Sequence, residues 1–269
     1  MFGIAQILWS ADPEIFRIGP VVLRWYSLCF LVTFVLGYFM MRRMFRFEGK
    51  SAKDLDSLVN HMVLGTLVGA RLGHCLFYDP AFYLSNPVEI FKIWRGGLAS
   101  HGAAIGIFIA LFLYARSRAD QSYLWILDRI VITVALGGFF IRIGNFFNSE
   151  IYGTPTGLPW AIVFSHVDAV PRHPAQLYES LAYGLIFLIL YTVWSRKRNG
   201  TPSGLLLGMF LVSVFSFRVV IEFVKVRQAA YGHGFPLSVG QWLSIPLVIL
   251  GIVLLVNASR RNRSSASTT

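Results

Sequence analysis

Apolar runs of about 20 residues recur along this chain of 269 residues, and they limit its possible fold more than any other feature. A helix of this length crosses the hydrocarbon core of a bilayer. We identify seven runs, at 21–41, 58–77, 98–115, 122–146, 176–195, 203–224 and 238–257. The runs are continuous rather than alternating, which excludes a transmembrane β-barrel. The sequence therefore predicts an all-α integral membrane protein with about seven transmembrane helices.

The basic residues predict the orientation of these helices. Hydrophobic residues make up 55% of the chain and charged residues 14%, yet the net charge is +11. With the N-terminus outside, the cytoplasmic segments collect most of the positive charge, at 42–53, 116–118, 196–198 and 260–263. The positive-inside rule thus favours an outside N-terminus and a cytoplasmic C-terminus. The charge reflects topology and contact with anionic lipid headgroups, and we expect no nucleic-acid partner.

No loop is long enough to fold alone, so we predict one polytopic membrane domain over 1–258. Outer arms lie near 1–20, 78–97 and 148–174, and a basic, disordered cytoplasmic tail covers 259–269. Glycines recur at four-residue spacing, which lets helix backbones approach closely and indicates helix packing. They are Gly65, Gly69, Gly73, Gly102 and Gly106.

A polar cluster ends the fourth apolar run. Arg142, Asn145 and Ser149 are three and four residues apart and share one helix face, while Asn148 and Glu150 follow where the helix ends. One arginine at the centre of a membrane helix costs roughly 2.5–3.5 kcal/mol, so such residues are usually paired or functional. The guanidinium fork binds phosphate and carboxylate well. An interhelical ion-pair network is the alternative, and spacing alone does not decide between the two.

A second arginine, Arg218, lies four residues before Glu222 in the sixth run, with Lys225 one turn further. The pair is either structural or, together with Arg142, part of one anion site. Charged residues elsewhere in the membrane runs more often neutralise a partner across helices; these are Arg71, Asp128 and Arg129.

His101 follows Gly96-Gly97 at the outer end of the third run. Histidine is suited to proton transfer near neutral pH, although a lone histidine at a helix start more often has a structural role. Tyr26, Gln176 and Glu179 add polar groups at similar depth, each weak evidence alone. Cys29 and Cys75 lie in apolar runs with no metal-ligand spacing, and we expect neither a metal nor a cofactor.

These motifs, in this order, resemble the prolipoprotein diacylglyceryl transferase family of bacterial membrane enzymes, over nearly the whole chain. The matching segments are Gly19-Pro20 with Arg24-Trp25-Tyr26, Gly96-Gly97 with His101-Gly102, 142–153, 172–179, Phe217-Arg218 with Glu222-Phe223, and 238–246. Two positions depart from the family pattern: Ala103 replaces a glycine, and Ile141 replaces a small residue. Neither change removes a polar group.

The resemblance implies transfer of the diacylglyceryl group of phosphatidylglycerol to the lipobox cysteine thiol of a prolipoprotein. A thioether forms and glycerol-1-phosphate leaves, as the first step of lipoprotein maturation. It also implies the bacterial cytoplasmic (inner) membrane, with the site towards the periplasm. Implied catalytic residues are His101, Arg142, Arg218 and Tyr26; implied substrate-binding residues are Arg142, Asn145, Glu150, Gly153, Arg218 and Glu222. The competing reading is a transporter that uses the same arginines to carry an anionic lipid or solute.

Within that resemblance we predict a division of roles. Arg142 and Arg218 grip the phosphate, Asn145 orients the headgroup, and two carboxylates, Glu150 and Glu222, fix the arginine forks. His101 is the candidate base for the cysteine thiol, assisted by Tyr26, although a thiol pKa lowered by the arginines is an alternative.

Overall fold

The computed structural model describes residues 7–226 and 237–266. The chain forms two compact units, one of Met1–Met41 with Asp128–Thr269 and one of Arg42–Leu127, and each is described by itself. The elements of the first unit are β1 (Ile7–Trp9), β2 (Glu14–Ile18), β3 (Val21–Arg24), most of α1 (Trp25–Phe47) and α5 (Tyr123–Phe147), β4 (Ile162–Phe164), β5 (Pro171–Arg172), α6 (Ala175–Lys197), η3 (Arg198–Gly200), α7 (Leu205–Ile221), η4 (Glu222–Val224) and α8 (Val239–Ala266).

The predicted helical class is confirmed. Each of the seven apolar runs overlaps one helix, in chain order α1, α2, α4, α5, α6, α7 and α8. In the described part of the chain, five helices are long and apolar enough to cross a membrane, namely α1, α5, α6 with η3, α7 with η4, and the Val239–Arg261 part of α8. Seven spans and the orientation of the termini stay predictions.

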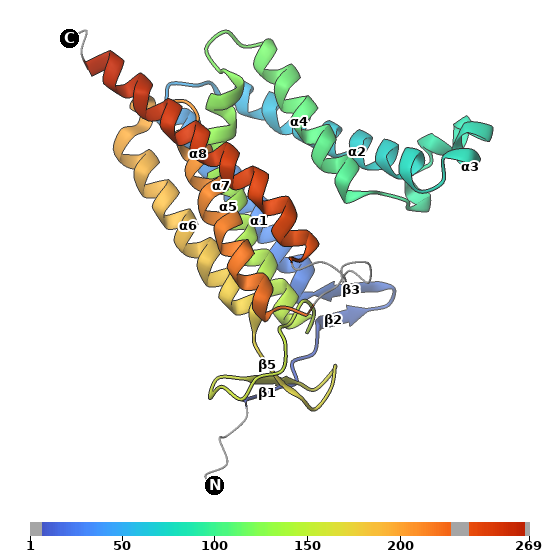
Figure 1. The fold of residues 1–269 in the computed structure, drawn as a ribbon. Helices are drawn as coiled ribbons and strands as arrows, with labels where there is room; N and C mark the ends of the chain where they lie inside the picture. The colour runs from blue at the N-terminus through green and yellow to red at the C-terminus, as the bar shows by residue number, and fades with distance from the viewer. Residues whose placement is uncertain (1–6, 227–236, 267–269) are drawn as a thin grey trace. The chain divides into compact units, whose positions relative to one another are not determined.

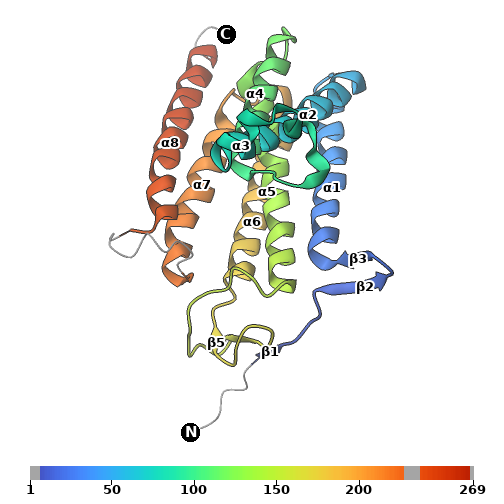
Figure 2. The same cartoon turned by 90° about the vertical axis from the view of Figure 1, so that its right-hand side faces the viewer.

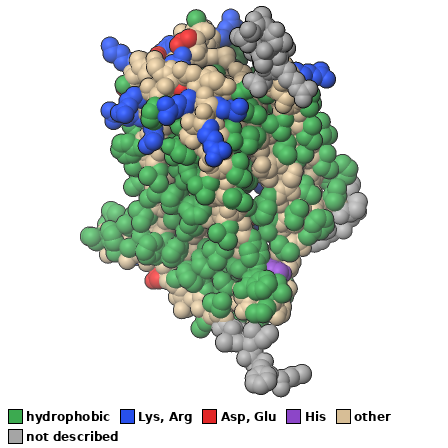
Figure 3. All heavy atoms as spheres, turned by 90° about the vertical axis from the view of Figure 1, so that its left-hand side faces the viewer, with side chains coloured by type: hydrophobic (Ala, Val, Ile, Leu, Met, Phe, Trp, Pro, Cys, Tyr) green, Lys and Arg blue, Asp and Glu red, His purple; other side chains and the backbone are tan. Residues whose placement is uncertain are grey.

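In the first unit, α5, α6, α7 and α8 lie side by side with α1 up to Met41 (Figures 1 and 2). Close contact with α1 follows from small residues, because a side chain on Gly137 would lie 2.8 Å from the Thr33 methyl group. Figure 3 shows hydrophobic side chains covering one face of the helices, with Lys and Arg gathered at one end; Arg196 and Lys197 form the basic last turn of α6. This distribution suits helices in a lipid bilayer.

Short strands were not predicted from the sequence. β2 and β3 form a hairpin that turns at Gly19, and β3 occupies the first residues of the predicted first span. A second sheet has the order β1-β4-β5, with β1 parallel to β4 and β4 antiparallel to β5. The end of α5 packs against this sheet through a cluster of Phe146, Ile162 and Phe164 with Trp9, Tyr152 and Leu177. The sheet therefore adjoins the predicted site.

The predicted disordered tail differs from the structure. α8 continues to Ala266 and so includes most of 259–269. No glycine or proline occurs after Gly251, and arginine and alanine favour helix, so nothing in this segment stops the helix early.

The second unit contains α2 (Ala52–Phe77), α3 (Pro80–Ser85), η1 (Pro87–Phe91), η2 (Ile93–Arg95) and α4 (Ser100–Arg116). The glycine spacing predicted close packing, and this is confirmed. A Cβ at Gly65 would lie 2.6 Å from the Gly106 carbonyl oxygen, and a Cβ at Gly69 would overlap the Gly102 carbonyl. Any side chain at these positions would force the α2 and α4 backbones apart.

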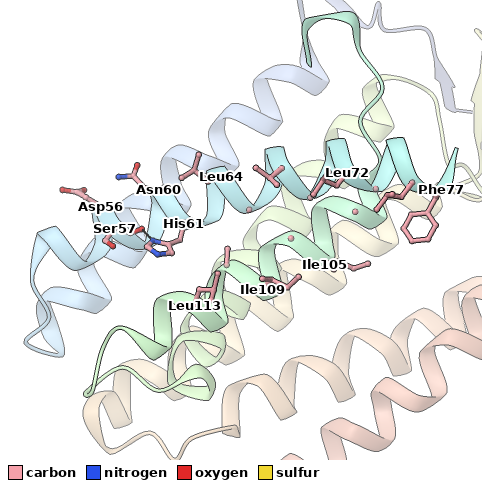
Figure 4. A pocket seen from close by; sticks show the side chains of 18 of the residues that line it. Asp56, Ser57, Asn60, His61, Leu64, Leu72, Phe77, Ile105, Ile109 and Leu113 are labelled. Atoms are coloured by element: carbon pink, nitrogen blue, oxygen red, sulfur yellow. Dashed lines mark hydrogen bonds between the residues drawn. The ribbon is translucent and has the colours of Figure 1, made fainter. Parts of the chain in front are cut away.

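A groove of about 1050 Å³ runs along α2 and α4 (Figure 4). Leu64, Leu72 and Ile109 lie along its apolar length, and polar side chains gather at one end, including Asn60 and His61. None of the predicted site residues lines it.

Candidate active site

The chain reverses direction just after α5 ends at Phe147. Ser149 and Ile151 have φ angles of +53° and +56°. Positive φ is unfavourable for residues other than glycine, above all for a β-branched one, and such strain collects at functional sites. Glu150 lies between these two residues, and its backbone N–H donates to the Asn145 carbonyl at 3.1 Å. The turn thus brings Glu150 back to the end of α5.

A chain of hydrogen bonds joins the arginine of α5 to this turn. The Arg142 Nη1 group donates to Asn145 Oδ1 at 3.1 Å, and Asn145 Nδ2 donates to Glu150 Oε1 at 2.7 Å. Asn148 Nδ2 donates to the same Glu150 oxygen at 3.3 Å, and Gln176 Nε2 of α6 holds the Glu150 carbonyl at 2.7 Å. Glu150 therefore acts on Arg142 through the Asn145 amide.

A buried carboxylate on α6 supplies the direct partner of Arg142. Glu179 has a side chain 3% exposed, and its Oε2 lies 3.1 Å from Arg142 Nε, close but not aligned for a hydrogen bond. Its Oε1 accepts from Lys225 Nζ at 3.3 Å. Glu179 was recognisable in the sequence as a polar residue at the start of the fifth run, but it was not among the predicted site residues. Its position three residues after Gln176, one helical turn away, was the only sign.

Tyr183 of α6 interacts electrostatically with both predicted phosphate-binding arginines, Arg142 and Arg218, and with Glu179. Gly138, one turn before Arg142 on α5, makes room for its ring, since a Cβ there would lie 2.8 Å from it. The two arginines, from α5 and α7, thus share one neighbour. Tyr183 was not singled out from the sequence, where it reads as one aromatic residue in an apolar run.

Arg218 is half-buried and forms no ion pair or hydrogen bond with another described residue. The expected pairing with Glu222 is therefore not made. Glu222 follows the last residue of α7, and its carboxylate oxygens lie 3.1 Å from the position that a Cβ on Gly240 of α8 would take. The Arg218 guanidinium keeps its donors free of protein acceptors in the part of the chain that is described.

Tyr26 lies in the first turn of α1 against the end of α5. Gly144 provides the space, because a Cβ there would be 2.9 Å from the Tyr26 ring. The neighbouring ring of Trp25 stacks on Phe147 with centroids 4.8 Å apart. The tyrosine thus lies beside the helix turn that carries Arg142 and Asn145.

Gly153 lies where three segments meet. Its N–H donates to the His173 carbonyl at 2.9 Å, and it forms an isolated antiparallel bridge with Lys225. A Cβ would lie 2.5 Å from the His173 Cβ and 2.6 Å from the Val224 carbonyl oxygen, so no other residue fits. Gly153 thereby fixes the backbone that presents Lys225 to Glu179.

His101 belongs to the second unit and lies exposed in the first turn of α4. The backbone before it is fixed: Ala99 N–H donates to the Ala70 carbonyl at 2.9 Å, and Gly96 and Gly97 have φ angles of +82° and +74°. No group of three or more histidine, cysteine or acidic side chains in the described ranges is placed to hold a metal ion.

Comparison with known proteins identifies relatives over nearly the full chain. A sequence model of the prolipoprotein diacylglyceryl transferase family matches residues 13–257. A phosphatidylglycerol–prolipoprotein diacylglyceryl transferase of Chloroherpeton thalassium is 50% identical over 257 residues, covering 96% of each chain. Proteins with the same name from Tolumonas auensis and Porphyromonas gingivalis are 46% and 42% identical, covering 95% and 94% of this chain and 98% and 95% of their own.

Proposed function

The chain belongs to the prolipoprotein diacylglyceryl transferase family, and within that activity we propose that Arg142 and Arg218 bind the phosphate of the lipid substrate. The protein is a multi-pass membrane transferase that moves the diacylglyceryl group from phosphatidylglycerol to a prolipoprotein. A transporter is not supported, because the family model and the relatives carry the name of the transferase.

One observation carries the phosphate assignment: two partly buried arginines share Tyr183 as a neighbour, and one of them, Arg218, forms no hydrogen bond or ion pair with another described residue. A guanidinium has five N–H donors. Arg142 donates from Nη1 to Asn145, directs Nε at Glu179 and is also a side-chain hydrogen-bond partner of Tyr183. Arg218 has no described acceptor at all. Unused donors on two rigid helices suit a phosphate that gains charge as it leaves.

The surrounding polar residues support the arginines rather than the lipid. Glu179 and Asn145 hold the Arg142 guanidinium from two sides, which limits its rotation. Lys225 offsets part of the Glu179 charge, so the carboxylate does not neutralise Arg142 completely. Glu150 keeps Asn145 in place. Such fixed donors stabilise a transition state without reorganisation.

The proposed reaction forms one bond and breaks one. The cysteine sulfur of the prolipoprotein lipobox attacks the terminal glycerol carbon of the diacylglyceryl group and forms a thioether. The bond from that carbon to the phosphate oxygen breaks, and glycerol-1-phosphate leaves with the electron pair. The attacking species is the thiolate, of which a free thiol has only about 3% at pH 7, so the thiol proton must be removed. His101 as the base, assisted by Tyr26, stays a prediction from the sequence.

We also propose the bacterial cytoplasmic (inner) membrane, with the arginine site towards the periplasm. Arg142 and Asn145 lie in the last turns of α5, at the end opposite to Ser117 and Arg118, which precede it. The basic last turns of α4 and α6 mark the predicted cytoplasmic ends.

A turnover assay tests the proposal. Purified protein in detergent is mixed with phosphatidylglycerol and a lipobox peptide, and both the peptide mass and released glycerol phosphate are followed. We expect a diacylglyceryl mass gain with the unaltered protein and a loss of roughly 100-fold or more with Arg142→Ala or Arg218→Ala. Arg17→Ala is the control, because Arg17 pairs with Glu14 in the β2–β3 hairpin.

Each variant is first compared with the unaltered protein by thermal unfolding. Folded Arg142→Ala with normal turnover would contradict the phosphate role. If the unaltered protein bound phosphatidylglycerol but the lipobox peptide gained no mass, a lipid transporter would be the better interpretation.

A further inference from the structure

Arg71 of α2 is buried, 5% exposed, and its guanidinium is surrounded by backbone carbonyl groups. Nε donates to the Ile90 carbonyl at 2.8 Å. Nη1 donates to the carbonyls of Gly96 and Gly97 at 2.5 and 3.1 Å. Nη2 donates to the carbonyls of Glu89 and Lys92 at 2.5 and 3.4 Å. All three guanidinium nitrogens therefore bind one short stretch of chain, residues 89–97.

This arrangement differs from the ion pair expected for Arg71. The Glu89 side chain faces other cations, with Oε1 2.5 Å from Lys92 Nζ and Oε2 2.8 Å from Arg95 Nη1. The Tyr83 ring covers the Arg71 guanidinium at 5.0 Å. Carbonyl dipoles and an aromatic face thus solvate the buried charge. The five carbonyls lie within and just after the short helical turns η1 and η2, and those of Glu89 and Lys92 also accept from the backbone N–H groups of Lys92 and Arg95.

The same contacts determine how the chain enters α4. Gly97 has a φ of +74°, and a Cβ there would lie 2.9 Å from Arg71 Nη1 and 2.6 Å from the His74 ring. Two residues further, the Ala99 N–H donates to the carbonyl of Ala70, the residue before Arg71, at 2.9 Å. Arg71 and its neighbour thus hold both sides of the Gly96-Gly97 turn. His101 follows in the next turn of backbone.

We propose that Arg71 is a positioning residue for the transfer reaction: it ties residues 89–97 to α2 and thereby sets the backbone that carries His101. The inference rests on the proposed function through the role of His101. Lysine cannot replace Arg71 in this role. An ammonium group is a point charge with three donors, whereas the planar Arg71 guanidinium donates to five carbonyls in two directions.

The test combines hydrogen exchange with kinetics on the full-length protein in detergent. Arg71→Lys keeps the charge but not the fork, and Gly97→Ala crowds the same turn while leaving Arg71 in place. Arg118→Lys is the matched control, because Arg118 also lies in the second unit, packs on the Tyr114 ring at 5.1 Å and bonds Asp54 at 2.8 Å. It is far along the chain from 89–97.

In Arg71→Lys and Gly97→Ala, we expect amide exchange of residues 86–99 to rise at least 10-fold, with exchange in α7 and α8 unchanged. We expect kcat to fall roughly 10- to 100-fold with KM for phosphatidylglycerol within about 3-fold of normal, because misplacement of about 1 Å has effects of this size. Arg118→Lys should leave both the exchange of 86–99 and kcat unchanged. Should Arg71→Lys fail to fold, Gly97→Ala decides.

Normal exchange of 86–99 in folded Arg71→Lys would overturn the inference, and so would faster exchange with normal kcat. His101→Gln separates this failure from that of the proposed function. If His101→Gln keeps normal kcat, the base role of His101 is wrong and Arg71 loses its proposed target. If His101→Gln is inactive but Arg71→Lys keeps normal kcat, only the positioning role is wrong.

Discussion

At the scale of single residues, the site is held by a carboxylate with cations on two sides. Glu179 lies between Arg142 and Lys225 with a side chain only 3% exposed. Removing one partner of a buried charge group leaves the others uncompensated, which usually costs several kcal/mol. Glu179 therefore sets both the direction of the Arg142 fork and the positive charge that remains for the phosphate.

Glu179→Gln should loosen Arg142 without emptying the space on α6. The amide carries no charge to hold Nε, so we expect kcat/KM for phosphatidylglycerol to fall roughly 10- to 100-fold while the protein stays folded. The measurement is the turnover assay over a range of lipid concentrations. Asp168→Asn is a matched control, because Asp168 pairs with Arg172 of β5 at 2.6 Å. Equal activity of the two variants would show that Glu179 does not position the arginine.

Part of this site follows from the sequence, and the reason is local. Arg142, Asn145 and Glu150 were predicted together because they lie on one helix and the turn after it, where spacing fixes proximity. Glu179 and Tyr183 come from another helix, and which side chains meet between two packed helices depends on their crossing and rotation. Gly138 sets that approach here by making room for the Tyr183 ring, and a glycine alone does not identify its neighbour.

At the scale of elements, the N-terminus of α7 is capped by a side chain of another helix, α5. Gly204, its N-cap residue, has no side chain, and Asp128 of α5 takes the place of a capping group. Asp128 Oδ2 accepts from the Gly204 N–H at 2.7 Å, and Oδ1 accepts from the Leu207 N–H at 2.8 Å. Its contact with Arg129 is longer, at 4.0 Å. The carboxylate predicted to neutralise a partner across helices instead caps one.

Asp128→Ala should lower the stability of the folded protein by about 1–2 kcal/mol, the usual range for a lost N-cap. Asp128→Asn removes the charge near Arg129 but keeps one side-chain oxygen that can accept from one of the two N–H groups. We therefore expect its loss of stability to be less than half that of Asp128→Ala. Thermal unfolding in detergent measures both, with Asp120→Asn as the control, since Asp120 is exposed and pairs with Lys50. If Asp128→Asn lost as much stability as Asp128→Ala, the ion pair between Asp128 and Arg129 would be the more important contact.

Elements without a helical period were the ones that sequence reasoning missed. The strands β1, β4 and β5 have two to three residues each, too few for an alternating pattern. Pairing between β1 and β4 joins segments far apart in the chain, so neighbouring residues give no sign of it. The long helices were readable because a bilayer demands length and apolarity that few other structures require.

At the scale of the whole molecule, the family and the apolar helices define a multi-pass membrane enzyme, while its orientation remains a prediction. Labelling of single cysteines tests it, in a chain where Cys29→Ser and Cys75→Ala remove the two free thiols. In intact spheroplasts, a membrane-impermeant maleimide should label Gly157→Cys. It should label Ser117→Cys and Asn199→Cys only after lysis. The reverse pattern would place the arginine site at the cytoplasmic face.

The parallel pairing of β1 with β4 has a consequence for biosynthesis. Ile7 pairs with Ile162, so the first strand to leave the ribosome has no partner until the whole of α5 and the turn after it exist. At roughly 5–20 residues per second, this interval is on the order of ten seconds. During that time the nascent chain carries an unpaired strand edge, which a chaperone or a neighbouring chain can occupy. The β1-β4-β5 sheet therefore forms only after residues 162–172 have been synthesised, long after its first strand.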